Sequence, residues 1–587
     1  MVKTTQFITI AAIANIAIGA AAQDNKLTIN VAEAGTLPTL ISSEQKSSVT
    51  DLTVTGKLNG TDIKFLREMA GVDQYGSAVS GNSLKTLNFS GADIVEGGEP
   101  YYYTYTTTDN NIGEFFFNSC PQLQSVKISE TATRISWDAF GGCTSLTSFS
   151  VPDAVTYIDQ AILENCTALE SVTFGKGLKT IDGYNFSGCT SLKKIELPEG
   201  LEELNEYNFY NCTSLESVVV PGTVKSIGGY EFNGCTALKD VTIKDGVNEL
   251  QQACFSECSG LQAIVLPNSI TTIEENAFDE CSSLTDITLP NSLDSISDYM
   301  FNSCTALEHI TIPESVTKIG YGAFCYDDHL LSINIPDNVT SVGESCFFDC
   351  EAMTEANIGS GLKDLGKNAF KFCEALQNIN VSKDNKNYTS VDGALYNKDI
   401  TSLIMLPANN CEEYTTPSTV TSISDNAAIT NMRLKRLTIG ENVTTIGEKA
   451  FQKCDNLEYL YIGSNVKTIG EDAFFMCEAI KEIHSMTKEP LEIDLYMFWD
   501  VDKEQCTLYV PAGSLDLYKA AEGWKEFTKI EEVGTSGISE ITTSSNFVTV
   551  YNAHGEKIYD GSASNFKPTV HNLYIISDGH KSTKTAR

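Results

Sequence analysis

The sequence predicts a solenoid, in which many short repeats stack on one another, rather than several compact domains. Three observations predict this fold. Cysteines recur every 23 residues from Cys120 to Cys304, hydrophobic residues keep fixed distances from each cysteine, and many units end in a short alternating segment with proline, as in "CSSLTDITLP" at 281–290. A unit this short cannot bury its own apolar face, so neighbouring copies must complete the core.

The cysteine register extends over about fifteen units. Asp327 takes the place of one cysteine, Cys350 and Cys373 restore the register, and Asn431 resumes it after an insertion. Phenylalanine usually lies three positions before the cysteine and leucine three positions after it. Aliphatic residues six and eight positions after the cysteine alternate with polar ones, which is typical of a strand with one buried face.

The unit pattern, Leu-x-x-Ile-x-Ile-Pro-x-x-Val-x-x-Ile-Gly-x-x-Ala-Phe-x-x-Cys, resembles the 23-residue leucine-rich repeat of BspA-like bacterial surface proteins. The resemblance covers residues 112–485. It implies an α/β repeat protein, a right-handed leucine-rich-repeat solenoid with a parallel sheet on one face. Proteins of this kind are secreted or displayed on the cell surface and are linked to adhesion.

The repeated cysteines are expected to be buried free thiols. Equivalent residues of stacked coils lie about 4.8 Å apart with parallel Cβ vectors, whereas a disulfide needs Cβ atoms about 3.8 Å apart. The pairs Cys254/Cys258 and Cys346/Cys350 raise the alternative of a metal site, but no histidine lies within ten residues of either pair. The sequence therefore predicts packing residues and no metal site.

The N-terminal residues have the plan of an export signal. Residues 1–22 contain one lysine and a mostly apolar run and end in three consecutive alanines, which predicts a signal peptide cleaved after Ala22. Residues 23–111 lack the repeat and are expected to cap the first coil. Within the array, about residues 382–410 predict an inserted hairpin.

The C-terminal part predicts three further pieces. Residues 486–530 are expected to cap the last coil, and residues 531–545, rich in Ser, Thr and Gly, predict a linker. Residues 546–587 predict a small β domain. That domain resembles the sorting domains of some host-associated anaerobic bacteria, and the resemblance implies a secretion sorting signal.

Composition excludes some functions. The chain has 77 acidic and 40 basic residues and a net charge of −37, which argues against nucleic-acid binding. No further stretch is apolar enough to predict a transmembrane segment. The sequence shows no serine or cysteine nucleophile arranged with any of the six histidines. It also contains neither a glycine-rich phosphate-binding loop nor a His-Glu-x-x-His zinc motif. We therefore expect no enzyme, no catalytic residues and no cofactor.

A candidate binding site lies in the last three coils. Positions five and seven after the cysteine point away from the core, because they alternate with buried positions. In most coils the position seven after the cysteine holds a small polar residue, but at the two positions the last coils hold Arg436, Tyr459, Tyr461 and His484. Tyrosine and arginine commonly anchor interfaces. The alternative is that the insertion or the C-terminal cap folds over these residues and buries them.

The sequence thus predicts a secreted or surface-displayed protein that mediates adhesion or protein–protein binding. Its expected partners are extracellular proteins or surface glycans of a host or of other microbes. The alternative is a structural or immune-stimulating surface component without a dedicated ligand.

Overall fold

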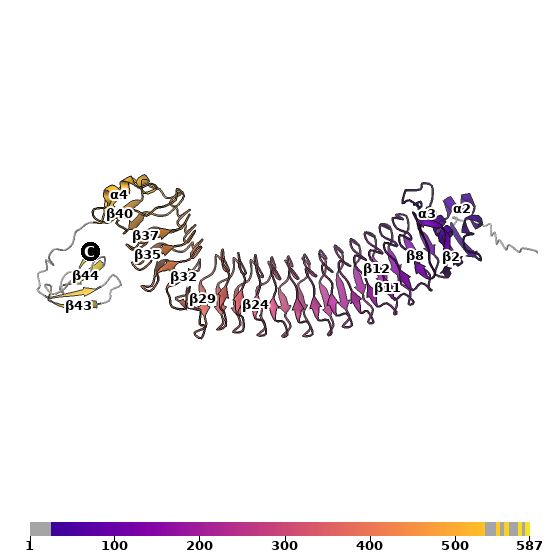
Figure 1. Cartoon of the computed structure of the whole chain (residues 1–587), viewed down its shortest axis with the longest axis horizontal. Coiled ribbons are helices and arrows are strands. Elements are labelled where there is room, and N and C mark those ends of the chain that lie inside the picture. Colours follow the sequence, from indigo (N-terminus) through magenta and orange to yellow (C-terminus); the bar gives the residue numbers. More distant parts are fainter. Residues whose placement is uncertain (1–24, 534–546, 552–556, 563–572, 578–581, 587) are drawn as a thin grey trace, which may run out of the picture. The chain divides into compact units, whose positions relative to one another are not determined.

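The computed structural model describes residues 25–533 and the backbone of four later strands within residues 547–586 (Figure 1). The chain divides into two compact units, residues 1–247 and residues 248–587, and each is described by itself. The predicted signal peptide and most of the predicted linker lie outside the described residues. In both units the coils stack in parallel, which confirms the predicted solenoid with its parallel sheet.

The first unit has one long face sheet. Neighbouring strands pair in parallel, and in the repeats each residue pairs with the residue 23 positions later, such as Ser148 with Ser171. In sheet order the strands are β1 (Lys26–Val31), β2 (Asp51–Leu58), β3 (Thr86–Asn88), β8 (Ser125–Lys127), β10 (Ser148–Ser150), β12 (Ser171–Thr173), β14 (Lys194–Glu196), β16 (Ser217–Val220) and β18 (Asp240–Ile243), with β4 (Ala92–Ile94) pairing β2.

A second, narrower parallel sheet was not predicted from the sequence. It consists of two-residue strands, one per coil, in each of which a mostly polar residue precedes an isoleucine, leucine or valine. In the first unit these strands are β7 (Asn111–Ile112), β9 (Arg134–Ile135), β11 (Tyr157–Ile158), β13 (Thr180–Ile181), β15 (Glu203–Leu204) and β17 (Ser226–Ile227). The isoleucine or leucine of each strand is buried, so the narrow sheet closes the second side of the core.

Helices flank the repeats and do not occur within them in the described residues. In the first unit, α1 (Leu37–Leu40), α2 (Ser43–Ser48), α3 (Gly60–Met69) and the hairpin β5 (Gly97–Tyr102)–β6 (Tyr105–Thr107) precede the first cysteine. Helix α3 begins at a capping box formed by Asn59 and Asp62. These elements lie where an open solenoid end requires a covering segment, and the N-terminal cap stays a prediction.

The second unit repeats both sheets with interruptions. Its face sheets contain β20 (Ala263–Val265) and β22 (Asp286–Thr288), then β25 (Ser332–Ile335), β27 (Glu355–Ile358) and β29 (Asn378–Val381), then β33 (Glu413–Thr415), β35 (Arg436–Ile439), β37 (Tyr459–Ile462), β39 (Glu482–Ser485), β40 (Thr507–Val510) and β41 (Lys529–Glu532). Its narrow sheets contain β19 (Glu249–Leu250) and β21 (Thr272–Ile273), then β23 (Ser295–Ile296), β24 (Lys318–Ile319), β26 (Ser341–Val342) and β28 (Asp364–Leu365), and finally β34 (Ser422–Ile423), β36 (Thr445–Ile446) and β38 (Thr468–Ile469).

The insertion forms an antiparallel meander of three strands, one more than the hairpin that the sequence predicts. Strand β30 (Tyr388–Val391) pairs β31 (Ala394–Asn397), and β31 pairs β32 (Ser402–Met405). Strand β32 then pairs β34 in parallel. The meander thus replaces β28 as the neighbour of the next coil in the narrow sheet.

The C-terminal segment closes the core of the last coils. It contributes α4 (Leu515–Ala520) and the short 3-10 helix η1 (Trp524–Glu526), and its large side chains are buried. The Tyr518 hydroxyl bonds to Ser485 and Thr487, and the Trp524 indole donates to the Leu491 carbonyl at 2.8 Å. The last described strands form an antiparallel sheet in the order β43 (Lys557–Ser562), β42 (Phe547–Tyr551), β44 (Leu573–Ser577) and β45 (Ser582–Ala586).

The third side of each coil is a set of turns rather than a helix. Residues five positions and one position before the cysteine adopt the left-handed conformation, for example Tyr299 (φ 54°) and Ser303 (φ 59°). The N–H groups of these two residues, and of the phenylalanine between them, point to the next coil. Tyr299, Phe301 and Ser303 donate to the backbone carbonyls of Tyr321, Ala323 and Cys325 at 2.9, 2.9 and 2.8 Å. A ladder of three alternate hydrogen bonds therefore joins consecutive coils on this side.

The column cysteines are buried unbridged thiols. Many donate S–H to the carbonyl 26 positions earlier, such as Cys281 to Phe255 at 3.2 Å. Burial raises the pKa of the Cys212 thiol well above its ordinary value. Asp327 and Asn431 fill the same position, and Asp327 accepts from the Cys304 N–H at 2.8 Å. The cysteine is thus a compact side chain that fills the column and satisfies a carbonyl.

We expect thiol labelling to separate the native from the unfolded protein. A maleimide should modify most of the 18 cysteines after denaturation but few in the native state, because burial lowers both access and thiolate content. Cys411, which is partly exposed, should react first. Intact mass after labelling measures the number of modified thiols, and oxidised column cysteines in a denatured, non-reduced sample would contradict the prediction.

Candidate binding surface

The four predicted binding residues lie on adjacent strands of the last face sheet. Strands β35, β37 and β39 pair Arg436 with Tyr459, and Tyr459 with Glu482. One step along the strands, Tyr461 pairs with His484. Since side chains of one strand alternate between faces, all of these residues project from the face opposite the buried Leu460 and Ile483.

The structure brings the predicted residues into contact. The Arg436 guanidinium lies 3.8 Å from the centroid of the Tyr459 ring. The His484 ring lies 5.1 Å from Tyr459 and 6.0 Å from Tyr461, measured between centroids. Tyr509 of β40 stacks on His484 at 4.6 Å and 18°. We call these five side chains the aromatic row.

Tyr509 is a member of the row that sequence reasoning missed. It pairs with His484 across β39 and β40, at a separation of 25 rather than 23 residues. The alternation in "TLYV" after Cys506 was the available signal, but it does not follow the cysteine register. A tyrosine outside the repeat therefore extends the row by one strand.

Two carboxylates fix the polar atoms of the row. Glu441 accepts from the Tyr461 hydroxyl at 2.7 Å, and Glu482 contacts the His484 ring nitrogen Nε2. Burial, followed by the bond to Glu441, raises the pKa of the Tyr461 hydroxyl. Burial raises the pKa of Tyr459, while the nearby Arg436 charge opposes this rise. Both hydroxyls are therefore neutral at physiological pH.

The row is partly open to solvent. Arg436 is exposed, and Tyr459, Tyr461, His484 and Tyr509 are half-buried. The C-terminal segment extends the edge of this sheet through β40 and β41. Helix α4 contributes Tyr518, whose hydroxyl contacts the buried Ser485.

Earlier coils present a different surface at the same positions. Asn334, Asn357 and Asn380 form an amide ladder in which each Nδ2 donates to the preceding Oδ1, at 2.8 and 2.9 Å. Thr173 and Ser150 are joined by a hydroxyl bond at 2.9 Å. These side chains bond to one another and offer little apolar area. Val219 and Val265 occupy the same position in two other coils and are exposed, but among the described strands of the repeats the aromatic rings on this face gather in the row.

A parallel-sheet solenoid that presents aromatic and cationic side chains on an open sheet face belongs to the class of leucine-rich-repeat scaffolds. The family model for the BspA type leucine rich repeat region matches residues 110–235, 202–330, 305–410 and 407–509. These matches span more than half of the chain, and the protein belongs to this family.

Solved structures of bacterial leucine-rich-repeat proteins are similar to this chain. One from Bacteroides ovatus is 21% identical, with a TM-score of 0.41, covering 69% of this chain and 88% of its own. A leucine rich cell surface protein from Faecalibacterium prausnitzii is 23% identical, with a TM-score of 0.41, covering 66% and 88%. The pneumococcal vaccine antigen PcpA is 17% identical, with a TM-score of 0.29, covering 66% and 89%. No curated protein matches the chain significantly.

None of the helices described is both long and apolar enough to span a membrane. Within the same part of the chain, His, Cys, Asp and Glu side chains form no group of three or more suited to hold a metal ion.

Proposed function

We propose that this protein is exported and acts as an adhesin, binding extracellular proteins or surface glycans of a host or of other microbes. The aromatic row carries this proposal. Tyrosine and arginine supply most of the binding energy in many interfaces, and here they lie together on a rigid sheet. Half-buried rings lose little conformational freedom when a partner covers them, which favours binding.

Two further features support export and binding rather than catalysis. Residues 1–22 have the composition of a signal peptide with a cleavage site after Ala22. Residues 546–587 resemble a secretion sorting domain, and four of their strands form an antiparallel sheet. Within the row, Glu441 accepts a hydrogen bond from the Tyr461 hydroxyl and Glu482 contacts the His484 ring, and these contacts hold both rings in place.

Substituting the row should abolish binding without unfolding the protein. We expect a variant with Arg436→Ala, Tyr459→Ala and Tyr461→Ala to lose about tenfold or more in affinity for a ligand found among immobilised matrix proteins, serum proteins and glycans. Surface plasmon resonance on that ligand measures the loss. Circular dichroism and thermal unfolding establish that the variant is folded.

A control variant changes three residues on the same face in other coils, at the strand position that Tyr461 occupies in its own coil. Thr288→Ala, Asn334→Ala and Asn357→Ala should leave the affinity within about twofold, because these side chains offer little contact energy. Unchanged binding by the row variant, together with lowered thermal stability, would assign the row a structural role. The absence of binding to every immobilised protein and glycan would contradict the adhesin function itself.

A further inference from the structure

The inserted meander interrupts the hydrogen-bond ladder on the turn side of the second unit. In the coil before the interruption, Ser345, Phe347 and Asp349 donate their N–H groups to the carbonyls of residues 367, 369 and 371, at 3.0, 2.8 and 2.9 Å. After the interruption the ladder resumes, and the Asn426 N–H donates to the Glu448 carbonyl at 2.9 Å. Among the coils that the structure describes, only the coil at residues 366–373 faces the meander instead of a regular neighbour.

This coil has donors without acceptors. The equivalent N–H groups belong to Asn368, Phe370 and Phe372, and no described residue accepts a hydrogen bond from them. On the far side, the Ala427 carbonyl that would face this coil accepts instead from the Leu406 N–H of the insertion, at 2.7 Å. Phe370 is only 1% exposed, so its free N–H lies in a largely buried position.

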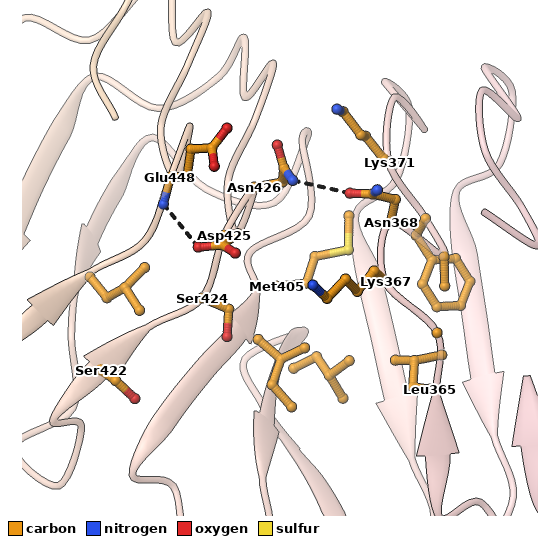
Figure 2. Close-up of a pocket in the computed structure, with 16 residues that line it drawn as sticks. Leu365, Lys367, Asn368, Lys371, Met405, Ser422, Ser424, Asp425, Asn426 and Glu448 are labelled. Atoms are coloured by element: carbon orange, nitrogen blue, oxygen red, sulfur yellow. Dashed lines mark hydrogen bonds between the residues drawn. The ribbon is translucent and has the colours of Figure 1, made fainter. Parts of the chain in front are cut away.

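A cavity of about 560 Å³ occupies the interruption. Its floor includes Leu395, Ile404 and Met405 of the meander, and its walls are the coils on either side (Figure 2). Asn426 bridges the walls through a 3.0 Å bond from its Nδ2 to Asn368 Oδ1. The buried Oδ1 of Asn426 has no hydrogen-bond partner among the described atoms. The volume lies within the range of roughly 300–1,000 Å³ that is usual for ligand pockets.

Two lysines give one wall a positive charge. Figure 2 shows Lys367 extending into the cavity beside Met405, and Lys371 at the rim above Asn368. Neither ammonium group forms an ion pair with a carboxylate of the described residues. Burial, and then the nearby Lys449 charge, lowers the pKa of Lys371. Asp425 and Glu448 lie on the opposite wall, where Asp425 accepts a hydrogen bond from the Glu448 N–H at 2.9 Å. The preference for an anion is therefore confined to the wall that carries the two lysines.

We propose that this cavity binds a short extended peptide bearing acidic side chains. The regular partner of this N–H row is a set of three alternate carbonyls from a neighbouring chain segment, and an extended peptide supplies such carbonyls. Main-chain bonds to residues 368, 370 and 372 fix the peptide, Met405 and the other floor residues contact its apolar parts, and Lys367 and Lys371 bind its carboxylates. The site is separate from the aromatic row.

Binding of defined peptides to the full chain tests this site. The probe is acetyl-Ala-Glu-Ala-Glu-Ala-amide, measured by isothermal titration calorimetry at low salt, with the Gln and Lys analogues for comparison. We expect the Glu peptide to bind at least about tenfold more tightly than either analogue, and Lys367→Ala with Lys371→Ala to lose about tenfold or more. Lys318→Ala, on exposed β24, is the matched control and should bind as the parent does.

Hydrogen exchange tests the main-chain part of the proposal, which no side-chain variant can address. The peptide should slow exchange at the amides of Phe370 and Phe372, because these N–H groups gain acceptors. The proposal would be overturned if the Glu, Gln and Lys peptides bound equally well, or if the double lysine variant bound the Glu peptide as tightly as the parent does. Unchanged exchange at the Phe370 and Phe372 amides would overturn it as well. Binding of glutamate alone with the affinity of the peptide would also overturn it and leave a simple anion site. The Arg436, Tyr459 and Tyr461 variant should bind the peptide normally, so failure of the adhesin proposal is distinguishable.

Discussion

Replacing Phe324 by alanine should destabilise the second unit by about 3–5 kcal/mol. Phe324 is fully buried and stacks on Phe301 and Phe347, with centroids 5.3 and 5.4 Å apart. The stack continues through the coils, so a missing ring opens a cavity between two rigid layers that cannot close independently. The loss combines the transfer free energy of the ring with the cost of that cavity.

Urea denaturation followed by circular dichroism measures the loss for Phe324→Ala. The control is Tyr321→Ala, which removes another aromatic ring from the same coil but at a side chain that is 41% exposed. That change should cost about 0.5 kcal/mol or less. Hydrogen exchange at the coils of Phe301 and Phe347 should accelerate in Phe324→Ala only. A loss below about 1 kcal/mol would show that the phenylalanine column does not dominate the packing.

The cysteine spacing predicted the solenoid because every unit must present the same side chains to its neighbours. The narrow sheet was missed, since two-residue strands such as β24 are too short to show an alternating pattern. The left-handed turns were missed as well. Residues such as Asn276 (φ 59°) and Glu280 (φ 56°) are not glycines, and only the inter-coil hydrogen bonds select this conformation for them.

Part of the candidate binding surface was predictable from the 23-residue register alone. That register sets Arg436 beside Tyr459, and Tyr461 beside His484. Tyr509 and the cavity at the insertion were not predictable from that register. Tyr509 joins the row at a different spacing, and the cavity exists only because the meander holds two coils apart.

A core position in the first unit carries a charge-bearing residue. Asn185, Asn208 and Glu231 occupy the position before the repeated phenylalanine, where later coils hold residues such as Ala277, and all three are fully buried. The Asn208 side chain accepts from the Asn185 N–H at 3.1 Å, and Glu231 Oε2 accepts from the Asn208 N–H at 3.0 Å. Glu231 Oε1 is buried without a hydrogen-bond partner among the described atoms. Burial raises the pKa of Glu231 well above its ordinary value, against the opposing effect of the bonds from Asn208.

Glu231→Gln should therefore stabilise the first unit at neutral and higher pH. Below about pH 4.3, the ordinary glutamate pKa, folded and unfolded chains both hold the proton, and Glu231 makes its full contribution to stability. As pH rises, the unfolded chain releases this proton while the folded chain retains it, so stability falls until the raised folded pKa is passed. Glutamine stays neutral and avoids this loss, which we expect to amount to about 1–3 kcal/mol at pH 8, since each pH unit between the unfolded and the folded pKa removes about 1.4 kcal/mol. Urea unfolding of the parent and of Glu231→Gln from pH 4.5 to 8 should give a difference in the free energy of unfolding that grows with pH.

Glu206→Gln, a change at an exposed residue of the same unit, controls for the lost charge. Parallel pH profiles for the parent and Glu231→Gln would contradict the prediction.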